Sequence, residues 1–146
     1  MKIIQNNKKA YFEYFIEDTF EAGIVLKGSE VKSVKNGHMS IVDSFVSIKD
    51  NEVFLKNAYI KPYEKANNFA PDEKRIRKLL LNKIEIEKIK KKVETKGYTL
   101  VPTKVYLKDN LVKVEIGVAR GKKLYDKRET IKERELNRRI KQEVVL

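Results

Sequence analysis

Cysteine is missing from this 146-residue chain, and histidine occurs once, as His38. The absence of cysteine excludes disulfide bonds, thiolate zinc sites and cysteine nucleophiles. With a single imidazole, a transition-metal site would need carboxylates for most of its ligands, and a histidine-based triad would depend on His38 alone. Glu13 and Glu17 lie close in sequence, but they fall on a predicted solvent-facing row, where carboxylates do little acid–base work. We therefore expect no metal, no cofactor and no enzymatic activity.

Long apolar segments are also missing. The first twelve residues, MKIIQNNKKAYF, lack the apolar segment of a secretory signal peptide. No apolar run in the chain approaches the ~20 residues that a membrane-spanning helix requires. We therefore expect a cytoplasmic protein without a membrane partner.

Negative charge is scarce relative to positive charge. Lysine and arginine number 33 against 21 aspartate and glutamate residues, which leaves a formal net charge of +12. A hydrophobic content of 41% suffices for a folded core, and the length is that of one domain. This surplus of charge predicts a polyanionic partner, with nucleic acid ahead of an acidic membrane. The alternative is a lysine-rich surface that serves only solubility.

Apolar residues alternate with polar ones in several short segments, which is the period of half-buried strands. A break at residues 18–19 separates the first two segments. In the last hairpin, the odd positions from Val101 to Leu107 are predicted to share one face. Asp and Asn tolerate positive φ, so the pairs at 50–51 and 109–110 suit tight turns. The predicted strands are 12–16, 20–26, 46–48, 53–55, 101–107 and 112–118.

Two helices are predicted between these strands. The first spans residues 29–36. The second has Asn82 as a candidate N-cap, Glu85 three residues later as in a capping box, and an apolar stripe that ends before Gly97. Residues 62–75 show no clear period and are interpreted as a loop, with room for one short turn of helix.

About six strands and two to three helices predict a mainly β fold with flanking helices. We expect a small closed antiparallel β-barrel of the OB-fold type, because closure removes exposed strand edges. The predicted barrel body covers residues 1–119, and a basic C-terminal tail covers residues 120–146.

The tail differs from the body in composition. It holds ten basic and five acidic residues, so it carries +5 of the net charge, and it contains five of the seven arginines. Its apolar residues are sparse, so an isolated helix could bury little surface there. We expect the tail to be disordered in the free protein and helical when bound. Because guanidinium groups bind phosphate in a bidentate manner, the tail is also predicted to engage RNA.

Other basic residues cluster in the body. Lys8 and Lys9 precede the first predicted strand, and residues 74–78 hold four lysines and arginines. Lysines also cover residues 88–92, where a solvated helix face is the simpler interpretation. In the tail, Tyr125 is a candidate for stacking on an unpaired base.

Several strings of the chain, in their order and spacing, resemble the bacterial SsrA-binding protein family. This resemblance implies an OB-type barrel that binds the tRNA-like domain of transfer-messenger RNA (SsrA). The RNA is delivered to stalled ribosomes for trans-translation, that is, ribosome rescue and tagging of the nascent chain for degradation. The strings are residues 7–10, 13–16, 20–26, 28–33, 77–81 and, above all, GVARGKKLYDKR at 117–128.

The resemblance also implies particular residues. The family's RNA-contacting positions match Asn7, Glu21, Leu80 and Lys113, and we add their basic neighbours Lys8, Lys9, Arg77 and Lys78. In the family, the tail becomes helical in the mRNA channel near the small-subunit decoding centre, and Tyr125 stands where several relatives have histidine. We expect a monomeric adaptor. The predicted ribosome-binding residues are Arg120, Lys122, Lys123, Tyr125, Asp126, Lys127 and Arg128.

Two alternatives stay open at this point. A ribosomal or initiation-type barrel protein bound to rRNA would have the same composition. A hydrolase that uses carboxylates and a divalent cation to process RNA would need a carboxylate cluster, which the sequence does not supply.

Overall fold

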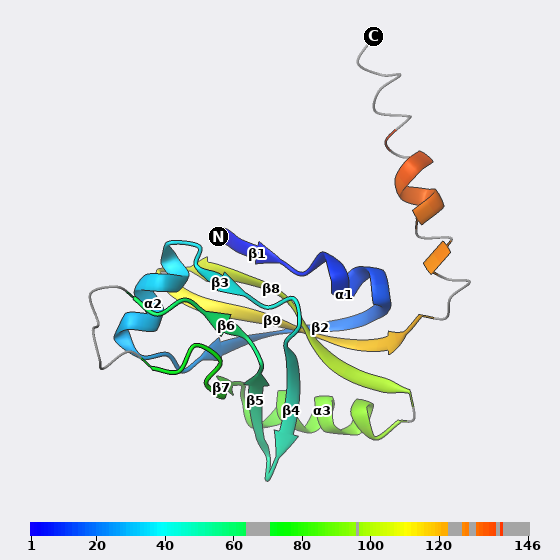
Figure 1. Cartoon of the computed structure of the whole chain (residues 1–146). Helices are drawn as coiled ribbons and strands as arrows, with labels where there is room; N and C mark the ends of the chain where they lie inside the picture. The colour runs from blue at the N-terminus through cyan, green and yellow to red at the C-terminus, as the bar shows by residue number, and fades with distance from the viewer. Residues whose placement is uncertain (64–70, 96, 123–126, 129–130, 137, 139–146) are drawn as a thin grey trace.

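The computed structural model describes residues 1–63, 71–95, 97–122, 127–128, 131–136 and 138 (Figure 1). Residues 131–136 are helical. The elements of the body are β1 (Lys2–Asn6), α1 (Lys8–Glu13), β2 (Tyr14–Ile24), α2 (Gly28–Lys35), β3 (Met39–Ser40), β4 (Phe45–Lys49), β5 (Glu52–Lys56), β6 (Tyr59–Ile60), β7 (Arg77–Leu80), α3 (Lys83–Glu94), β8 (Tyr98–Lys108) and β9 (Leu111–Gly121).

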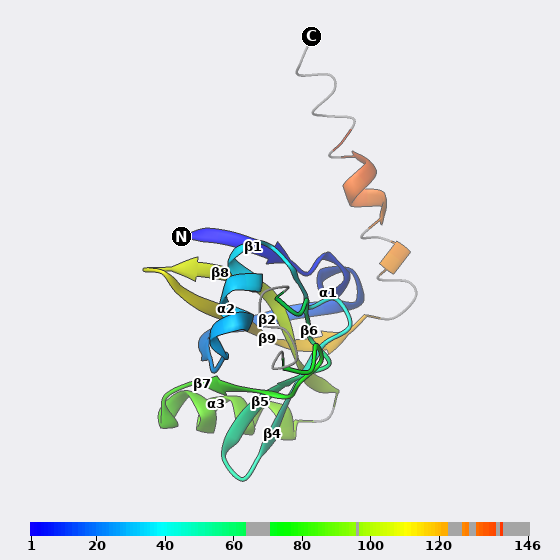
Figure 2. The ribbon, with the colours of Figure 1, turned by 60° about the vertical axis from the view of Figure 1, so that its left-hand side comes forward.

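Seven of the strands form one open antiparallel sheet. Their order is β1-β8-β9-β2-β7-β5-β4, and β3 and β6 form a separate two-stranded ladder. The sheet curls so that β4 approaches β8 (Figure 2), but no ladder joins these two strands in the described part of the chain. The mainly β class with flanking helices is confirmed, whereas the predicted closed barrel is wrong.

The edge of β8 shows why the sheet stays open. The Asn7 side chain donates from Nδ2 to the Pro102 carbonyl oxygen at 2.8 Å, on the side of β8 that faces away from β9. The N–H and C=O of a strand residue point to the same neighbour, and proline has no N–H. At Pro102 this edge therefore offers a closing strand no N–H donor, and its carbonyl oxygen already accepts from Asn7, so strand pairing is unfavourable there.

The N-terminal segment differs from the prediction. A strand is predicted over residues 12–16, but α1 continues to Glu13 and β2 begins at Tyr14. The Asn7 side chain accepts a hydrogen bond from the Ala10 amide, so it caps α1. The predicted break at residues 18–19 is wrong, because both residues pair with β9 and β2 continues to Ile24. A bulge lies just before them, where the register with β9 shifts by one residue between Ile16 and Asp18.

A second bulge changes which residues of β8 face the core. The register shifts between Pro102 and Lys104, and one residue is inserted into the strand. Leu100 and Val105 therefore lie in the main core, while Val101 packs on the other face with Ala10 and Ala119. The prediction that Val101 shares a face with Val105 and Leu107 is wrong, because one extra residue inverts the alternation.

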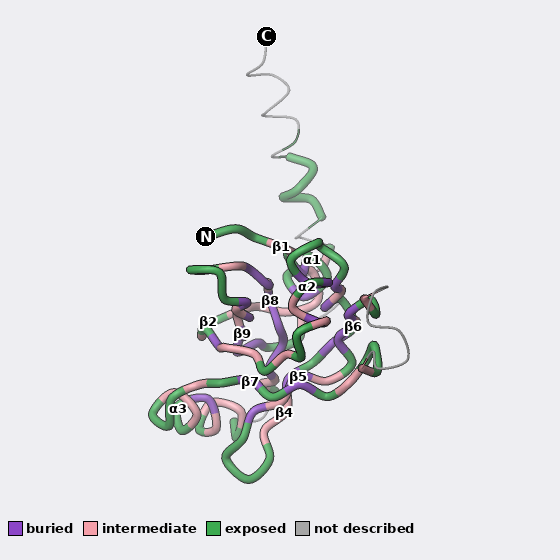
Figure 3. Tube along the Cα trace, turned by 90° about the vertical axis from the view of Figure 1, so that its left-hand side faces the viewer, coloured by how far each residue is buried: buried purple, intermediate pink, exposed green. Residues whose placement is uncertain are grey.

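The two predicted helices and both tight turns are confirmed, whereas the loop predicted over residues 62–75 lies partly outside the described residues, which omit 64–70. Both tight turns have residues with positive φ, at 50–51 and 109–110. Asn82 Oδ1 accepts from the Glu85 amide at 2.8 Å, and Glu85 Oε1 accepts from the Asn82 amide at 3.3 Å, which completes the capping box of α3. Ile89 of that helix is fully buried, and Figure 3 shows buried positions concentrated on the strands. Within the described residues, no helix has both the length and the apolar character needed to cross a membrane.

Gly117 lies where β9 comes close to side chains of both neighbouring strands. A Cβ there would lie 2.9 Å from Thr103 Cγ2 and 3.0 Å from Ile16 Cγ2. We expect Gly117→Ala to lower the free energy of unfolding by about 1–3 kcal/mol, because both neighbours are held by strand backbone. Gly121→Ala on the same strand is the control, since its Cβ would meet no atom within 4 Å. Urea unfolding of both variants measures the difference, and equal stabilities would contradict the expected clash.

Candidate nucleic-acid interface

Gly23 lies at the centre of a depression on the sheet face opposite the main core. It pairs with Lys113 of β9 on one side and with Leu80 of β7 on the other. A Cβ on Gly23 would lie 3.4 Å from Leu80 Cβ, so a larger side chain would fill the space. The depression has a volume of about 230 Å³ and is lined by Leu80, Lys113, Leu111 and Leu26, among others. Its floor is mainly apolar, and a lysine stands at its rim.

Glu21 lies two residues before Gly23 on the same strand and therefore on the same face. The Tyr106 hydroxyl donates to Glu21 Oε2 at 2.5 Å, and Lys108 Nζ lies 3.5 Å from Oε1. The hydrogen bond from Tyr106 lowers the pKa of Glu21, partial burial opposes this, and Lys108 and Lys113 add to the lowering. The site therefore holds an ionised acceptor next to two cations.

The structure thus brings together three of the residues that the resemblance implied, Glu21, Leu80 and Lys113. Lys78 stands two residues before Leu80 on the same face, where its Nζ lies 3.3 Å from a carboxylate oxygen of Glu52. A depression with an apolar floor, lysines and a fixed acceptor can hold an unstacked base and its phosphate at once.

Sequence reasoning missed Tyr106 and Lys108 as members of this site. The signal was present in the hairpin, because a turn at 109–110 places Lys108 opposite Leu111 and Tyr106 opposite Lys113. Residues at equal distances from the turn pair across the hairpin, and paired residues share a face of the sheet, so Tyr106 lies on the same face as Lys113.

Asn7 is not on the surface. Its side chain is 2% exposed, caps α1, and donates to the Ile41 and Pro102 carbonyl oxygens at 3.4 and 2.8 Å. The side chain through which Asn7 was predicted to contact RNA is therefore covered in this structure. Asn7 instead fixes the start of α1 against the edge of β8.

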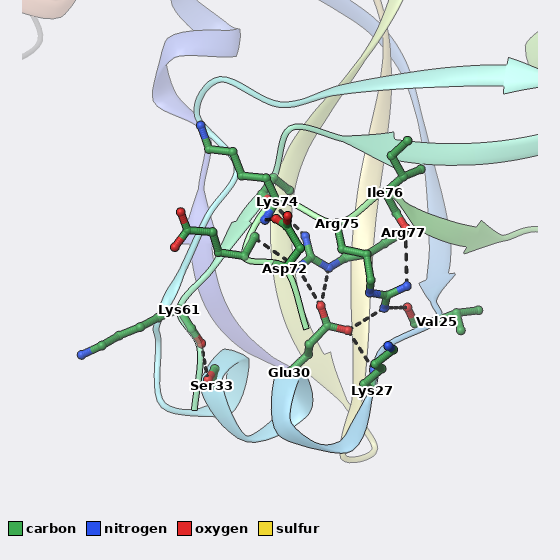
Figure 4. Close-up of polar contacts among 12 residues, drawn as sticks. Val25, Lys27, Glu30, Ser33, Lys61, Asp72, Lys74, Arg75, Ile76 and Arg77 are labelled. Atoms are coloured by element: carbon green, nitrogen blue, oxygen red, sulfur yellow. Dashed lines mark hydrogen bonds and ion pairs between the residues drawn. The ribbon is translucent and has the colours of Figure 1, made fainter. Parts of the chain in front are cut away.

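Arg77 is also buried, contrary to its assignment to an RNA-facing cluster. It is fully covered, and its Nε donates to Glu30 Oε2 at 2.8 Å while a terminal nitrogen donates to the Ala58 carbonyl oxygen at 2.8 Å. Arg75 donates to the other Glu30 oxygen at 2.6 Å (Figure 4). Burial alone would raise the pKa of Glu30, but the hydrogen bonds from Arg75, the Lys27 amide and Arg77 lower it overall. This network joins α2 to β7.

Lys8 and Lys9 lie on α1, which precedes Tyr14 at the far end of β2 from Gly23. Both lysines are exposed, and Lys9 Nζ pairs with Asp43 at 2.8 Å. The structure therefore does not bring these two lysines together with the depression. Their helix α1 instead lies near the end of β9 (Figure 1), where the Lys122 amide donates to the Glu13 carbonyl oxygen.

The tail begins on an aromatic surface. The Arg120 guanidinium and Lys122 Nζ lie 4.8 and 5.0 Å from the centre of the Phe15 ring, and the Lys122 amide donates to the Glu13 carbonyl oxygen at 2.8 Å. β9 continues to Gly121, so the strand extends past the predicted body boundary at residue 119.

Of the other predicted tail residues, Lys127 and Arg128 are helical, and Lys127 Nζ lies 6.0 Å from the centre of the Phe12 ring. The predicted residues outside the described part of the chain are Lys123, Tyr125 and Asp126.

A curved antiparallel sheet with an apolar depression, a lysine at its rim and a net charge of +12 is the arrangement of a nucleic-acid-binding protein. Comparison with known proteins shows to which family of nucleic-acid-binding proteins the chain belongs. The family model described as SmpB protein matches residues 4–145. The chain therefore belongs to the SmpB protein family.

Individual relatives agree with this assignment. The SsrA-binding protein of Thermoanaerobacter pseudethanolicus is 61% identical over 92% of this chain and 86% of its own length. That of Lachnoclostridium phytofermentans is 57% identical over 94% of this chain and 90% of its own length. A solved chain described under "tmRNA-SmpB: a journey to the center of the bacterial ribosome" is 47% identical, with a TM-score of 0.69 over 82% of this chain and 85% of that one.

Proposed function

We propose that this protein binds transfer-messenger RNA and delivers it to stalled ribosomes for rescue and tagging of the nascent chain. The observation that carries the proposal is the convergence of Glu21, Leu80 and Lys113 around Gly23, in a chain of the SmpB protein family. The relatives are named for binding SsrA, and the matched solved chain comes from work on tmRNA-SmpB in the ribosome.

The chemistry of the depression suits a folded RNA with unstacked bases. Leu80 is 52% exposed and offers an apolar surface for a base that has left its stack. Lys113 attracts phosphate without regard to sequence, and Glu21 accepts from base amino groups or 2′-hydroxyls. The tRNA-like domain is the part of the RNA that we assign to this face.

The basic segment after β9 is assigned to the ribosome. Its described residues 131–136 are helical and exposed, so most of their surface is open to a partner, although Arg134 lies 5.7 Å from the centre of the Phe12 ring. In this proposal the tail occupies the mRNA channel near the decoding centre, and the body binds transfer-messenger RNA. The protein acts as a monomeric adaptor without catalysis, in the cytoplasm with the ribosome. Disorder of the free tail stays a prediction.

A salt-titrated binding assay tests the proposal. Labelled tRNA-like domain and ordinary tRNA are each titrated with the wild-type protein, and we expect clear preference for the former with a steep salt dependence. Equal binding of both RNAs would contradict the proposed function. Sequencing of RNA recovered with the protein excludes the rRNA-binding alternative if transfer-messenger RNA dominates.

Lys113→Ala is the matching variant. We expect about a tenfold loss of affinity and a reduction of the salt slope by about one counterion, since one phosphate contact is removed. Lys91→Ala is the control, because Lys91 is exposed on α3 and does not line the depression. If both variants bind as the wild type does, Lys113 has no place in the interface.

A further inference from the structure

We infer that Tyr106 is a positioning residue for RNA recognition, which holds the Glu21 carboxylate so that one of its oxygens stays available to the RNA. This inference rests on the proposed function, because it concerns the same face of the sheet. It adds a group that makes no contact with RNA itself and acts through Glu21.

The geometry places Tyr106 where only its hydroxyl can reach the site. The residue is 4% exposed and belongs to β8, whereas Glu21 belongs to β2, with β9 between these strands. Tyr106 pairs with Lys113 of β9, and Glu21 pairs with Glu115 of the same strand, so the ring spans β9 diagonally. A buried tyrosine ring has only two side-chain torsions, so its hydroxyl is a rigid anchor.

The two oxygens of Glu21 differ as a result. Oε2 accepts the Tyr106 hydroxyl at 2.5 Å, whereas Oε1 faces Lys108 Nζ at 3.5 Å, and the side chain is 39% exposed. Oε1 already accepts from Lys108 Nζ in an exposed pair. Without the hydroxyl, exposed lysine pairs alone would hold the carboxylate, and its orientation would be less fixed. Tyr106 therefore keeps Oε1 in position as an acceptor before RNA arrives, which reduces the entropy cost of binding.

A fixed carboxylate on this face affects which RNA the protein binds, more than how strongly it attracts RNA in general. It repels phosphate, so it favours binding only where an RNA donor, such as a base amino group or a 2′-hydroxyl, meets it. Loss of the Tyr106 hydroxyl should therefore lower affinity for the tRNA-like domain and leave the general electrostatic attraction unchanged.

Tyr106→Phe tests this with a matched control on the same strand. The Tyr98 hydroxyl of β8 also interacts with a glutamate of β2, Glu17, which raises the pKa of Tyr98, and neither residue lines the depression. We expect Tyr106→Phe to weaken binding of the tRNA-like domain about tenfold with an unchanged salt slope, and Tyr98→Phe to bind within about twofold of wild type. Thermal unfolding of both variants shows that the comparison is made between folded proteins.

Two further readouts separate positioning from a general structural effect. An NMR titration of the Glu21 carboxyl carbon should show its pKa rising in Tyr106→Phe, because the hydrogen bond that lowers it is gone. In a Glu21→Gln background, Tyr106→Phe should cause little further loss of affinity. If Tyr106→Phe does not fold, Glu21→Asp withdraws the carboxylate from the hydroxyl, and about a tenfold loss is again expected.

The inference is overturned if Tyr106→Phe binds as wild type does, or if it loses as much affinity in the Glu21→Gln background as alone. If Tyr106→Phe does not fold and Glu21→Asp is used in its place, wild-type affinity of Glu21→Asp would also overturn the inference. Failure of the proposed function looks different, since wild-type protein would then show no preference for the tRNA-like domain over ordinary tRNA.

Discussion

Arg77→Met is expected to lower the free energy of unfolding by about 3–5 kcal/mol, the cost of removing one partner of a buried ion pair. The variant leaves the Glu30 carboxylate, which is 3% exposed, with Arg75 as its remaining charged partner. It also removes the donor to the Ala58 carbonyl oxygen. Since domains of this size are stable by about 5–15 kcal/mol, the loss is a large fraction of the total. Urea unfolding at neutral pH measures it.

Lys78→Met is the matched control for this experiment. Lys78 follows directly in sequence and pairs with Glu52 at 3.3 Å, but both side chains are about half exposed. An exposed pair contributes about 0–1 kcal/mol, so the control should unfold close to wild type. Similar losses in the two variants would show that the Glu30 network does not have the stabilising role assigned to it.

The pH dependence provides a second test of the same network. The folded-state pKa of Glu30 lies below its ordinary value, so its contribution to stability is complete above the unfolded-state pKa. That contribution is lost as the pH falls through the folded-state pKa. We therefore expect the stability of the wild type to decline below about pH 4.5, the range in which an unfolded glutamate begins to protonate. In Arg77→Met this decline should be smaller, because the loss of one hydrogen bond that lowers the folded-state pKa of Glu30 brings that pKa closer to the unfolded-state value.

Deletion of residues 123–146 is expected to abolish tagging of the nascent chain on stalled ribosomes while affinity for the tRNA-like domain stays within about threefold of wild type. The deletion point follows from the structure, because β9 continues to Gly121 and the Lys122 amide bonds the Glu13 carbonyl oxygen. The body keeps the depression around Gly23 intact, and the segment that we propose to bind the ribosome is lost.

Tagging is measured by translation of a message without a stop codon in a reconstituted system, and RNA affinity by titration. Deletion from Arg120 onward is the comparison, since it also removes the pairing of Arg120 with Phe15 and of Gly121 with Tyr14. That longer deletion should be less stable. Normal tagging by the shorter deletion would contradict the division between an RNA-binding body and a ribosome-binding tail.

The local elements of this protein could be predicted from its sequence because their signals are local. Asn82 and Glu85 cap α3 within one turn of chain, and the turns at 50–51 and 109–110 adopt positive φ because Asp and Asn permit it. The charge surplus likewise depends only on composition, so the sequence alone suffices to indicate a polyanionic partner.

The sheet faces could not be predicted as well, because a bulge is a relation between two strands. Nothing in the alternation around Thr103 shows that one residue is inserted opposite β9, yet this insertion places Val101 and Val105 on opposite faces. The open edge has the same origin, since it depends on Asn7 meeting Pro102 from 95 positions away in the chain.

The sequence by itself determined the secondary-structure elements at its strongest signals, the basic character and the family to which the motifs point. Only the tertiary structure decided which of the matched residues face outward. Asn7 and Arg77 are polar and were predicted to contact RNA, but both are buried. Their side chains donate hydrogen bonds to backbone carbonyl oxygens and, for Arg77, to Glu30. Glu21, Leu80 and Lys113 meet at Gly23 because three strands distant in sequence are paired there, and pairing between distant strands is set by the packing of the whole core.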